Sequence, residues 1–158
     1  MNTVENHLPL EQAIILDEAL KKAGVEMEIE FAWTDGSGHY DDVLDYSQDE
    51  KYKLIQIASD TLNEQKELYW ESNWYPAPTL SEMIELLPKE IRDYSLTLIF
   101  DTAYEEWICD WYKYGDVPIC WDSEVIENRN KITGDTLLEA VYEALLWCLR
   151  EGHVLGKG

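Results

Sequence analysis

The chain has 158 residues, of which 33 are Asp or Glu and 12 are Lys or Arg, so its formal net charge is −21. Hydrophobic residues make up 46% of it, including 7 Trp and 10 Tyr, which is too much apolar material for a disordered acidic tail. We predict a single domain over residues 1–158, with frayed ends at residues 1–8 and 153–158. Direct binding to nucleic acid or to an anionic membrane is disfavoured, because both require clustered Lys or Arg.

The N-terminus and the cysteines indicate the compartment. Residues 1–7 lack the charged segment and apolar run of a signal peptide, and no stretch approaches the about 18 apolar residues of a membrane span. Cys109, Cys120 and Cys148 are an odd, scattered set without a CxxC pair. We therefore expect a cytoplasmic protein whose cysteines are small buried side chains.

The first predicted element is an amphipathic helix over residues 9–23. Pro9 suits the first helical turn, and Gly24 suits the position just past the end. Apolar residues at helical spacing form its buried stripe, which Ile14 is expected to widen.

Residues 25–33 then alternate strictly between apolar and acidic or small residues, which predicts a half-buried strand. Turn residues follow at 34–38, so we expect a hairpin into a second strand near residues 40–44.

The segment over residues 49–70 leaves two alternatives open. It is either one long helix, or a short strand over residues 52–58 followed by a helix that a capping box of Thr61 and Glu64 begins.

The second half of the chain has clearer signals. Two prolines force residues 75–78 to be extended, and two further capping boxes, Thr79 with Glu82 and Thr136 with Glu139, begin helices. The elements expected here are a helix ending at Pro88, strands at 95–100 and 106–112, a possible strand near 117–122, and a helix over 136–151. The fold class that follows is α+β: one antiparallel sheet packed by N-terminal, central and C-terminal helices.

About half of the chain resembles a group of small uncharacterised acidic proteins from bacterial prophages and conjugative elements. The segments that carry the resemblance are Leu10-Glu11-Gln12-Ala13 with Leu20 and Ala23-Gly24-Val25, Tyr75-Pro76-Ala77-Pro78-Thr79-Leu80, Leu86-Leu87-Pro88-Lys89-Glu90-Ile91, and residues 137–145. That group has no established activity, so the resemblance implies a mobile-element context and an interaction or counter-defence role, but no functional residues.

Signals for chemistry are sparse. Asp35, His39 and Asp41 lie close together in a Gly-containing loop and are weak candidates for a metal site, although an ordinary hairpin loop has the same composition. The chain lacks an EF-hand, a nucleophile elbow, a P-loop and a dinucleotide-binding motif. We expect no catalytic residue, no cofactor and no enzymatic activity.

An aromatic cluster lies just before the proline-containing segment that leads into the helix at Thr79. Tyr69, Trp70, Trp74 and Tyr75 are candidates for a partner-binding or self-association patch, since aromatic side chains anchor many interfaces. The alternative is that they fill the core, because Trp is well buried on average.

A row of carboxylates is the second candidate surface. Glu26, Glu28 and Glu30 would lie about 6.6–6.8 Å apart on one face of a strand, and Asp41 and Asp42 extend the same base-free stretch. Such a ladder imitates a nucleic-acid backbone, although the outer face of a one-sided sheet has the same pattern.

We therefore expect a non-enzymatic acidic interaction protein that engages a basic host protein, as a nucleic-acid mimic in its sharpest form. The alternative is a small-molecule- or metal-binding or hydrolytic domain with an aromatic-lined pocket. Association with a second copy of the chain is a further expectation.

Overall fold

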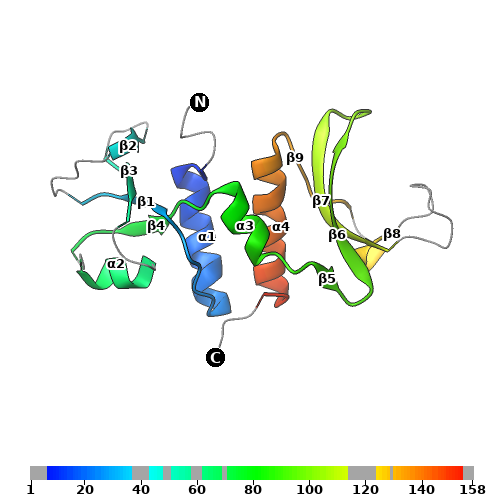
Figure 1. The fold of residues 1–158 in the computed structure, drawn as a ribbon, viewed down its shortest axis with the longest axis horizontal. Coiled ribbons are helices and arrows are strands. Elements are labelled where there is room, and N and C mark those ends of the chain that lie inside the picture. Colours follow the sequence, from blue (N-terminus) through cyan, green and yellow to red (C-terminus); the bar gives the residue numbers. More distant parts are fainter. Residues whose placement is uncertain are drawn as a thin grey trace. The chain divides into compact units, whose positions relative to one another are not determined.

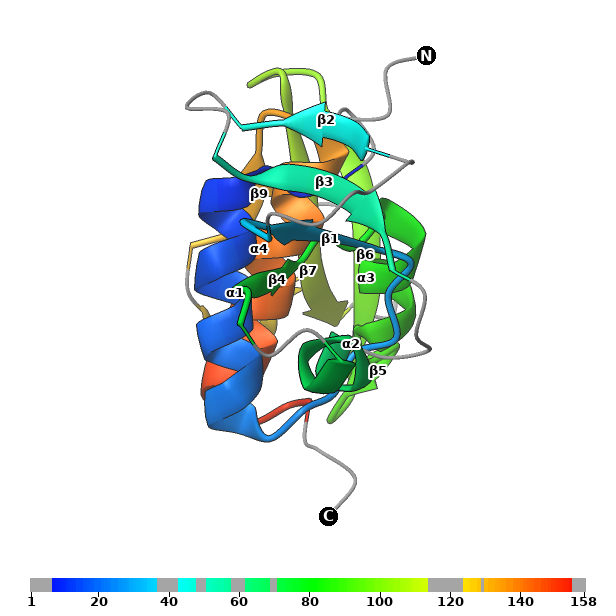
Figure 2. The same cartoon turned by 90° about the vertical axis from the view of Figure 1, so that its left-hand side faces the viewer.

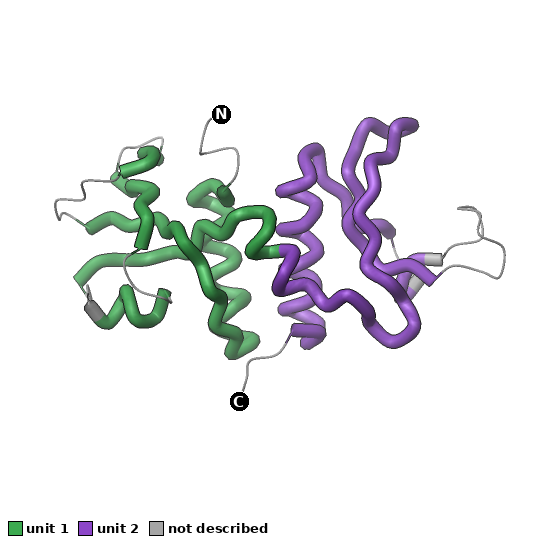
Figure 3. The backbone as a smooth tube through the Cα atoms, in the orientation of Figure 1, with its two compact units in different colours: residues 1–83, 155–158 green, residues 84–154 purple. Residues whose placement is uncertain are grey.

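The structure is a computed structural model that describes residues 7–36, 43–47, 51–57, 62–68, 71–113, 124–128 and 130–154. Helices and antiparallel sheets coexist in it, so the α+β class is confirmed (Figure 1). The described strands form two sheets where we expected one. The chain divides into two compact units, unit 1 within residues 1–83 and unit 2 over residues 84–154 (Figure 3). The single-domain organisation stays a prediction.

Unit 1 combines a four-stranded antiparallel sheet with helices. Its elements are α1 (Leu10–Ala23), β1 (Phe31–Thr34), β2 (Val43–Tyr46), β3 (Lys53–Gln56), α2 (Leu62–Leu68), β4 (Trp74–Pro76) and the first residues of α3 (Leu80–Leu86). The strand order is β2-β3-β1-β4, and Figure 2 shows the strands stacked in that sequence.

The ends of α1 match the prediction closely. Pro9 is extended and lies just before the helix, while Gly24 adopts the left-handed region with φ 68° and donates its N–H to carbonyls of the last turn. Leu16 is fully buried, but Ile14 is 40% exposed. The buried stripe of α1 is therefore narrower than we expected, because Ile14 lies outside the face of the helix that packs against the rest of unit 1.

The predicted hairpin between residues 25–33 and 40–44 is wrong. β3 lies between β1 and β2, so β1 pairs with β3 and β4 and never with β2. The run Leu54-Ile55 explains this order, since both residues are buried and a central strand buries both faces. The first strand also begins only at Phe31, later than the residue 25 that we expected.

The ambiguous middle segment follows the second alternative, a strand and then a helix. Its predicted cap residue Thr61 lies outside the described residues.

A small core holds unit 1 together. Ala13, Trp33, Leu54 and Ala77 are buried against one another, and Trp33 Nε1 donates a 2.9 Å hydrogen bond to the Leu8 carbonyl. We expected Leu8 and His7 to be frayed; instead, both are buried because this bond and ring packing on Phe31 fix them.

Unit 2 consists of a twisted antiparallel sheet with one long helix. Its elements are the last residues of α3, β5 (Glu90–Ile91), β6 (Tyr94–Asp101), β7 (Glu106–Lys113), β8 (Glu124–Val125), the 3₁₀ turn η3 (Ile126–Asn128), β9 (Thr133–Gly134) and α4 (Leu137–Glu151). The order is β5-β6-β7-β8, and β9 also pairs with β7 (Figure 1). The strand expected near residues 117–122 lies outside the described residues.

The two capping boxes are present. Thr79 Oγ1 accepts the Glu82 N–H while Glu82 accepts the Thr79 N–H at 2.8 Å, and Thr136 Oγ1 accepts the Glu139 N–H at 3.1 Å. Gly152 ends α4 with φ 76°. Just beyond it, Val154 is buried, whereas we expected a frayed end from residue 153.

β7 is the central strand of unit 2, and residues 108–112 are buried along it on both faces. This two-sided burial is typical of a central strand. Cys109 and Cys148 are fully buried, as predicted, and Cys120 lies outside the described residues. None of the described helices has the length and apolar character needed to cross a membrane.

Candidate functional site

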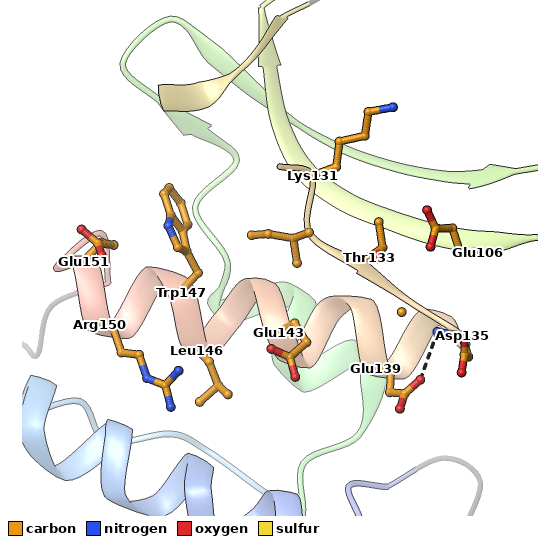
Figure 4. Close-up of a pocket in the computed structure, with 12 residues that line it drawn as sticks. Glu106, Lys131, Thr133, Asp135, Glu139, Glu143, Leu146, Trp147, Arg150 and Glu151 are labelled. Atoms are coloured by element: carbon orange, nitrogen blue, oxygen red, sulfur yellow. Dashed lines mark hydrogen bonds between the residues drawn. The ribbon is translucent and has the colours of Figure 1, made fainter. Parts of the chain in front are cut away.

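A groove of about 630 Å³ opens beside α4 in unit 2 (Figure 4). This volume lies within the range of about 300–1,000 Å³ that is typical of ligand sites. Residues from α4, from the start of β7 and from the segment around β9 line it: Glu106, Lys131, Ile132, Thr133, Gly134, Asp135, Glu139, Glu143, Leu146, Trp147, Arg150 and Glu151.

One wall of the groove is a stripe along α4. Glu139, Glu143, Trp147 and Glu151 are spaced four residues apart, so their side chains fall on one face of the helix. The helical rise separates Glu143 from Glu151 by about 12 Å along the axis. The stripe therefore presents three carboxylates and one indole ring to the same space.

The opposite wall is the segment that contains β9, and backbone contacts fix its position. A side chain on Gly134 would place its Cβ 2.5 Å from the Ala140 backbone nitrogen, so only glycine permits this approach to α4. Asp110 is fully buried in β7 and accepts the Ile132 N–H at 2.9 Å, while the Cys109 N–H donates to the Ile132 carbonyl. The groove is thus built on the central strand.

Trp147 is held by other rings. Its centroid lies 5.4 Å from that of Trp111 and 4.8 Å from that of His153. Trp111 is fully buried and donates its Nε1–H to the Pro88 carbonyl at 2.9 Å. Trp147 itself is half-buried, so part of its indole surface reaches the groove in a fixed orientation.

The lining carries an excess of negative charge. Five carboxylates face two cations, Lys131 and Arg150. One carboxylate, Glu139, accepts the Asp135 N–H at 3.0 Å (Figure 4). Within the described part of the chain, neither Glu143 nor Glu151 makes an ion pair. The groove consequently favours a positively charged occupant.

A second hollow, of about 330 Å³, lies in unit 1 and has a different charge balance. Asp17 is buried at its rim and forms ion pairs with Lys21 at 2.8 Å and with Lys66 at 3.3 Å. The hydrogen bond that Lys21 donates to Asp17, opposed in part by desolvation, raises the pKa of Lys21. These charges join α1 to α2, so the cluster has a structural explanation.

The three carboxylates of the predicted acidic row are exposed. Met27 and Ile29, which lie between Glu26, Glu28 and Glu30, are buried, so the predicted alternation is present; the row precedes β1, and its role as a ladder stays a prediction. Glu30 also accepts a 3.3 Å hydrogen bond from the Gln56 side chain. Glu26 also lines the second hollow. Asp41 and Asp42 lie outside the described residues.

The predicted aromatic patch is divided. Trp74 is only 2% exposed and belongs to the buried interior of unit 1. Tyr75 is half-buried, with its ring 6.0 Å from that of Tyr52. Tyr69 and Trp70 lie outside the described residues. Trp74 therefore offers no surface to a partner.

Of the three weak candidates for a metal site, only Asp35 is among the described residues. Asp35 accepts 2.8 Å hydrogen bonds from both the backbone and the side chain of Asn73. Burial alone would raise the pKa of Asp35, but these bonds and the charge of Lys51 outweigh it, so the pKa is lowered. His39 and Asp41 lie outside the described residues, and no three metal-ligating side chains converge in the rest.

No protein-family model, curated protein or solved structure matches the chain in the comparisons. Its groove must therefore be interpreted from its own residues. Sequence reasoning missed Glu143, Trp147 and Glu151. The signal that identifies them is their four-residue spacing on the side of α4 away from its apolar stripe.

Proposed function

We propose that this chain is a non-enzymatic interaction protein whose acidic groove in unit 2 binds a Lys- or Arg-rich segment of a basic partner protein. The observation that carries the proposal is the pairing of an excess of groove carboxylates with the fixed indole of Trp147. Carboxylates attract a cationic side chain, and an aromatic face adds a cation–π contact. The net charge of −21 would speed the encounter with such a partner.

The proposal extends to the setting of the protein. A cytoplasmic location and a mobile-element origin fit an acidic protein that acts on a basic host protein, as the resemblance over about half of the chain implies. Nucleic-acid mimicry is a narrower form of the proposal that depends on Glu26, Glu28 and Glu30, so converting these three residues to Gln tests it separately from the groove.

The test of the groove is peptide binding with a matched charge control. A labelled Arg- and Lys-rich peptide of about 12 residues is titrated with the parent protein and with a Glu143→Gln/Glu151→Gln variant, at about 50 mM and about 300 mM salt. The control variant, Glu11→Gln/Glu18→Gln, removes the same charge from exposed positions on α1. We expect about tenfold weaker binding for the groove variant and less than about twofold for the control.

Equal losses in the two variants would show that net charge alone attracts the peptide, and the groove would lose its role. A groove variant that binds as tightly as the parent at both salt concentrations would have the same meaning.

The second candidate function is binding of a small cationic molecule in the same groove, and Trp147 favours it because aromatic rings recognise organic cations. Isothermal titration with spermine and with choline distinguishes the candidates. Micromolar binding of either compound, lost in Trp147→Leu and absent for the basic peptide, would replace the protein partner by a metabolite.

A further inference from the structure

The β6–β7 hairpin of unit 2 has a second surface, away from the groove wall. β6 pairs with β7 from Ser95 to Asp101, without a register shift. On its outer edge, β5 pairs only with Tyr94 and Ser95, and one more bond joins the Leu96 N–H to the Lys89 carbonyl at 2.9 Å. No described strand covers residues 97–101 on that edge.

The direction of the backbone groups follows from the Leu96 bond. N–H and C=O groups alternate between the two sides of a strand, so those of Leu98 and Phe100 point outward in the same way as those of Leu96. In the part of the chain that the structure describes, these outward groups have no hydrogen-bond partner. The edge therefore offers two residues, each with one donor and one acceptor, to an incoming strand.

The side chains on this edge are apolar and accessible. Ile99 is 46% exposed and Phe100 is 45% exposed, although both belong to an eight-residue strand. α4 packs against β7 and β9, and Leu96 and Leu98 of β6 remain half-buried. An incoming strand would cover this apolar surface as well as the backbone groups.

The usual protections of an edge strand are missing. Natural edges carry charges, a proline or a bulge that prevents pairing with other chains. Residues 94–100 (YSLTLIF) contain neither a charge nor a proline, and the pairing with β7 has no bulge. This uncharged segment lies in a chain with net charge −21, and its edge can serve as a template for pairing with another strand.

The charge around the edge selects the occupant. Residues 93–112 contain no Lys or Arg, and Asp93, Asp101, Glu105 and Glu106 flank the uncharged run. A second copy of the chain would bring an equally acidic hairpin to this site. An extended segment with apolar residues at its centre and Lys or Arg at its ends would instead place positive charge next to those acids.

We infer that the outer edge of β6 at residues 97–101 binds an extended segment of a basic protein partner by β-strand addition. The inference rests on the proposed function for the charge of the partner, and it adds a second contact, formed by main-chain hydrogen bonds. Asp101 lies opposite Glu106 in the hairpin, and Glu106 also lines the groove, so the two contacts are adjacent.

The probe is a synthetic peptide of alternating Val and Thr, about five residues long, with two lysines at each end. The control is the same peptide with a methyl group on every second backbone nitrogen. This change keeps the charge of the peptide and removes its hydrogen-bond donors. We expect the unmodified peptide to bind the parent protein, and the methylated peptide to bind at least about tenfold more weakly.

Variants of the protein locate the contact. Leu98→Pro removes one outward N–H while leaving the β6–β7 bonds, because proline is tolerated at an edge that faces solvent. Leu98→Val is its matched control, since it keeps the N–H. We expect a loss of about tenfold for the first and less than about threefold for the second. Amide hydrogen exchange on the parent protein gives a measurement that needs no variant: the peptide should protect the amides of Leu98 and Phe100.

Each other outcome overturns the inference in a distinct way. Equal binding of the methylated peptide removes strand addition and leaves the groove proposal intact. Loss of binding only in Glu143→Gln/Glu151→Gln places the peptide in the groove. Protection of Leu98 and Phe100 that rises with protein concentration and without peptide, together with a dimer mass, assigns the edge to a second copy. If the peptide does not bind the protein at all, the inference is also overturned. The groove titration then remains as the separate test of the proposed function.

Discussion

The two hollows of this protein use acidic residues in opposite ways. In unit 1, Asp17 is buried and two lysines neutralise it, so its charge joins two helices. In unit 2, Glu143 and Glu151 are exposed on α4, and no ion pair involves them within the described residues. A carboxylate that is taken out of water needs partners, whereas an exposed one needs none. The comparison separates the acids that stabilise the fold from those that stay exposed along the groove.

The largest expected effect concerns the buried interior of unit 2. Burial, together with the charge of Asp110, raises the pKa of the Cys109 thiol from 9.0 to about 12. At about pH 8 its thiolate fraction therefore falls about a thousandfold, and alkylation of Cys109 by iodoacetamide should slow by at least that factor. Peptide mapping by mass spectrometry measures the rate, with the urea-unfolded chain as control. Similar alkylation rates in the folded and the urea-unfolded chain would show that Cys109 of β7 is not buried as the comparison requires.

The same shift predicts the alkaline behaviour of unit 2. A pKa raised by folding contributes stability that is complete below about pH 9 and is lost as pH rises toward 12, because the unfolded chain releases its thiol proton first. Burial raises the pKa of Tyr142 to about 12 as well, which adds to the effect. Urea unfolding followed between about pH 8 and pH 11 should show a falling free energy of unfolding. Cys109→Ala should flatten that fall, and an unchanged slope would contradict the assignment.

A smaller effect is expected from Asp110→Ala, which leaves the backbone donors of Trp111 and Ile132 without their buried carboxylate. We expect unit 2 to lose about 3 kcal/mol of unfolding free energy, measured by urea denaturation. Asp93→Ala, on the exposed turn before β6, is the control and should change it by less than about 0.5 kcal/mol. A small loss of unfolding free energy in Asp110→Ala would mean that other interactions hold the β9 wall of the groove in place.

Asp17→Ala sharpens the comparison from the side of unit 1. It leaves Lys21 and Lys66 without the acid between them, and we expect a loss of about 1–2 kcal/mol because both lysines retain access to water. Glu18→Ala is the neighbouring control, since Glu18 and its partner Lys22 are both largely exposed. Equal thermal shifts in the two variants would remove the structural role of Asp17.

The smallest expected effect is the change in unfolding free energy that substitutions in the groove cause. Glu143→Gln/Glu151→Gln should leave the unfolding free energy within about 0.5 kcal/mol of the parent, or raise it slightly, because like charges on one helix face repel. Its consequence should appear in peptide binding instead. A loss above about 1 kcal/mol would place these glutamates among the structural acids and undo the contrast with Asp17.

Local chemistry made much of this fold predictable. Helix ends followed from single residues such as Gly24 and Gly152, and from the capping box of Thr79, because these signals act within one turn. Strand order did not follow, since the insertion of β3 between β1 and β2 depends on which strand buries both faces. The groove could not be foreseen from any one segment. Its walls are distant in sequence and meet through the backbone approach at Gly134.

That approach at Gly134 also limits how the groove can change. Two main chains touch there, so the separation of the walls is already at its minimum on that side and cannot be narrowed by enlarging position 134. Variation in what the groove accepts must come from the side chains along α4, such as Glu143 or Trp147. An engineer who wishes to retarget this protein should accordingly randomise the helix face and leave the glycine untouched.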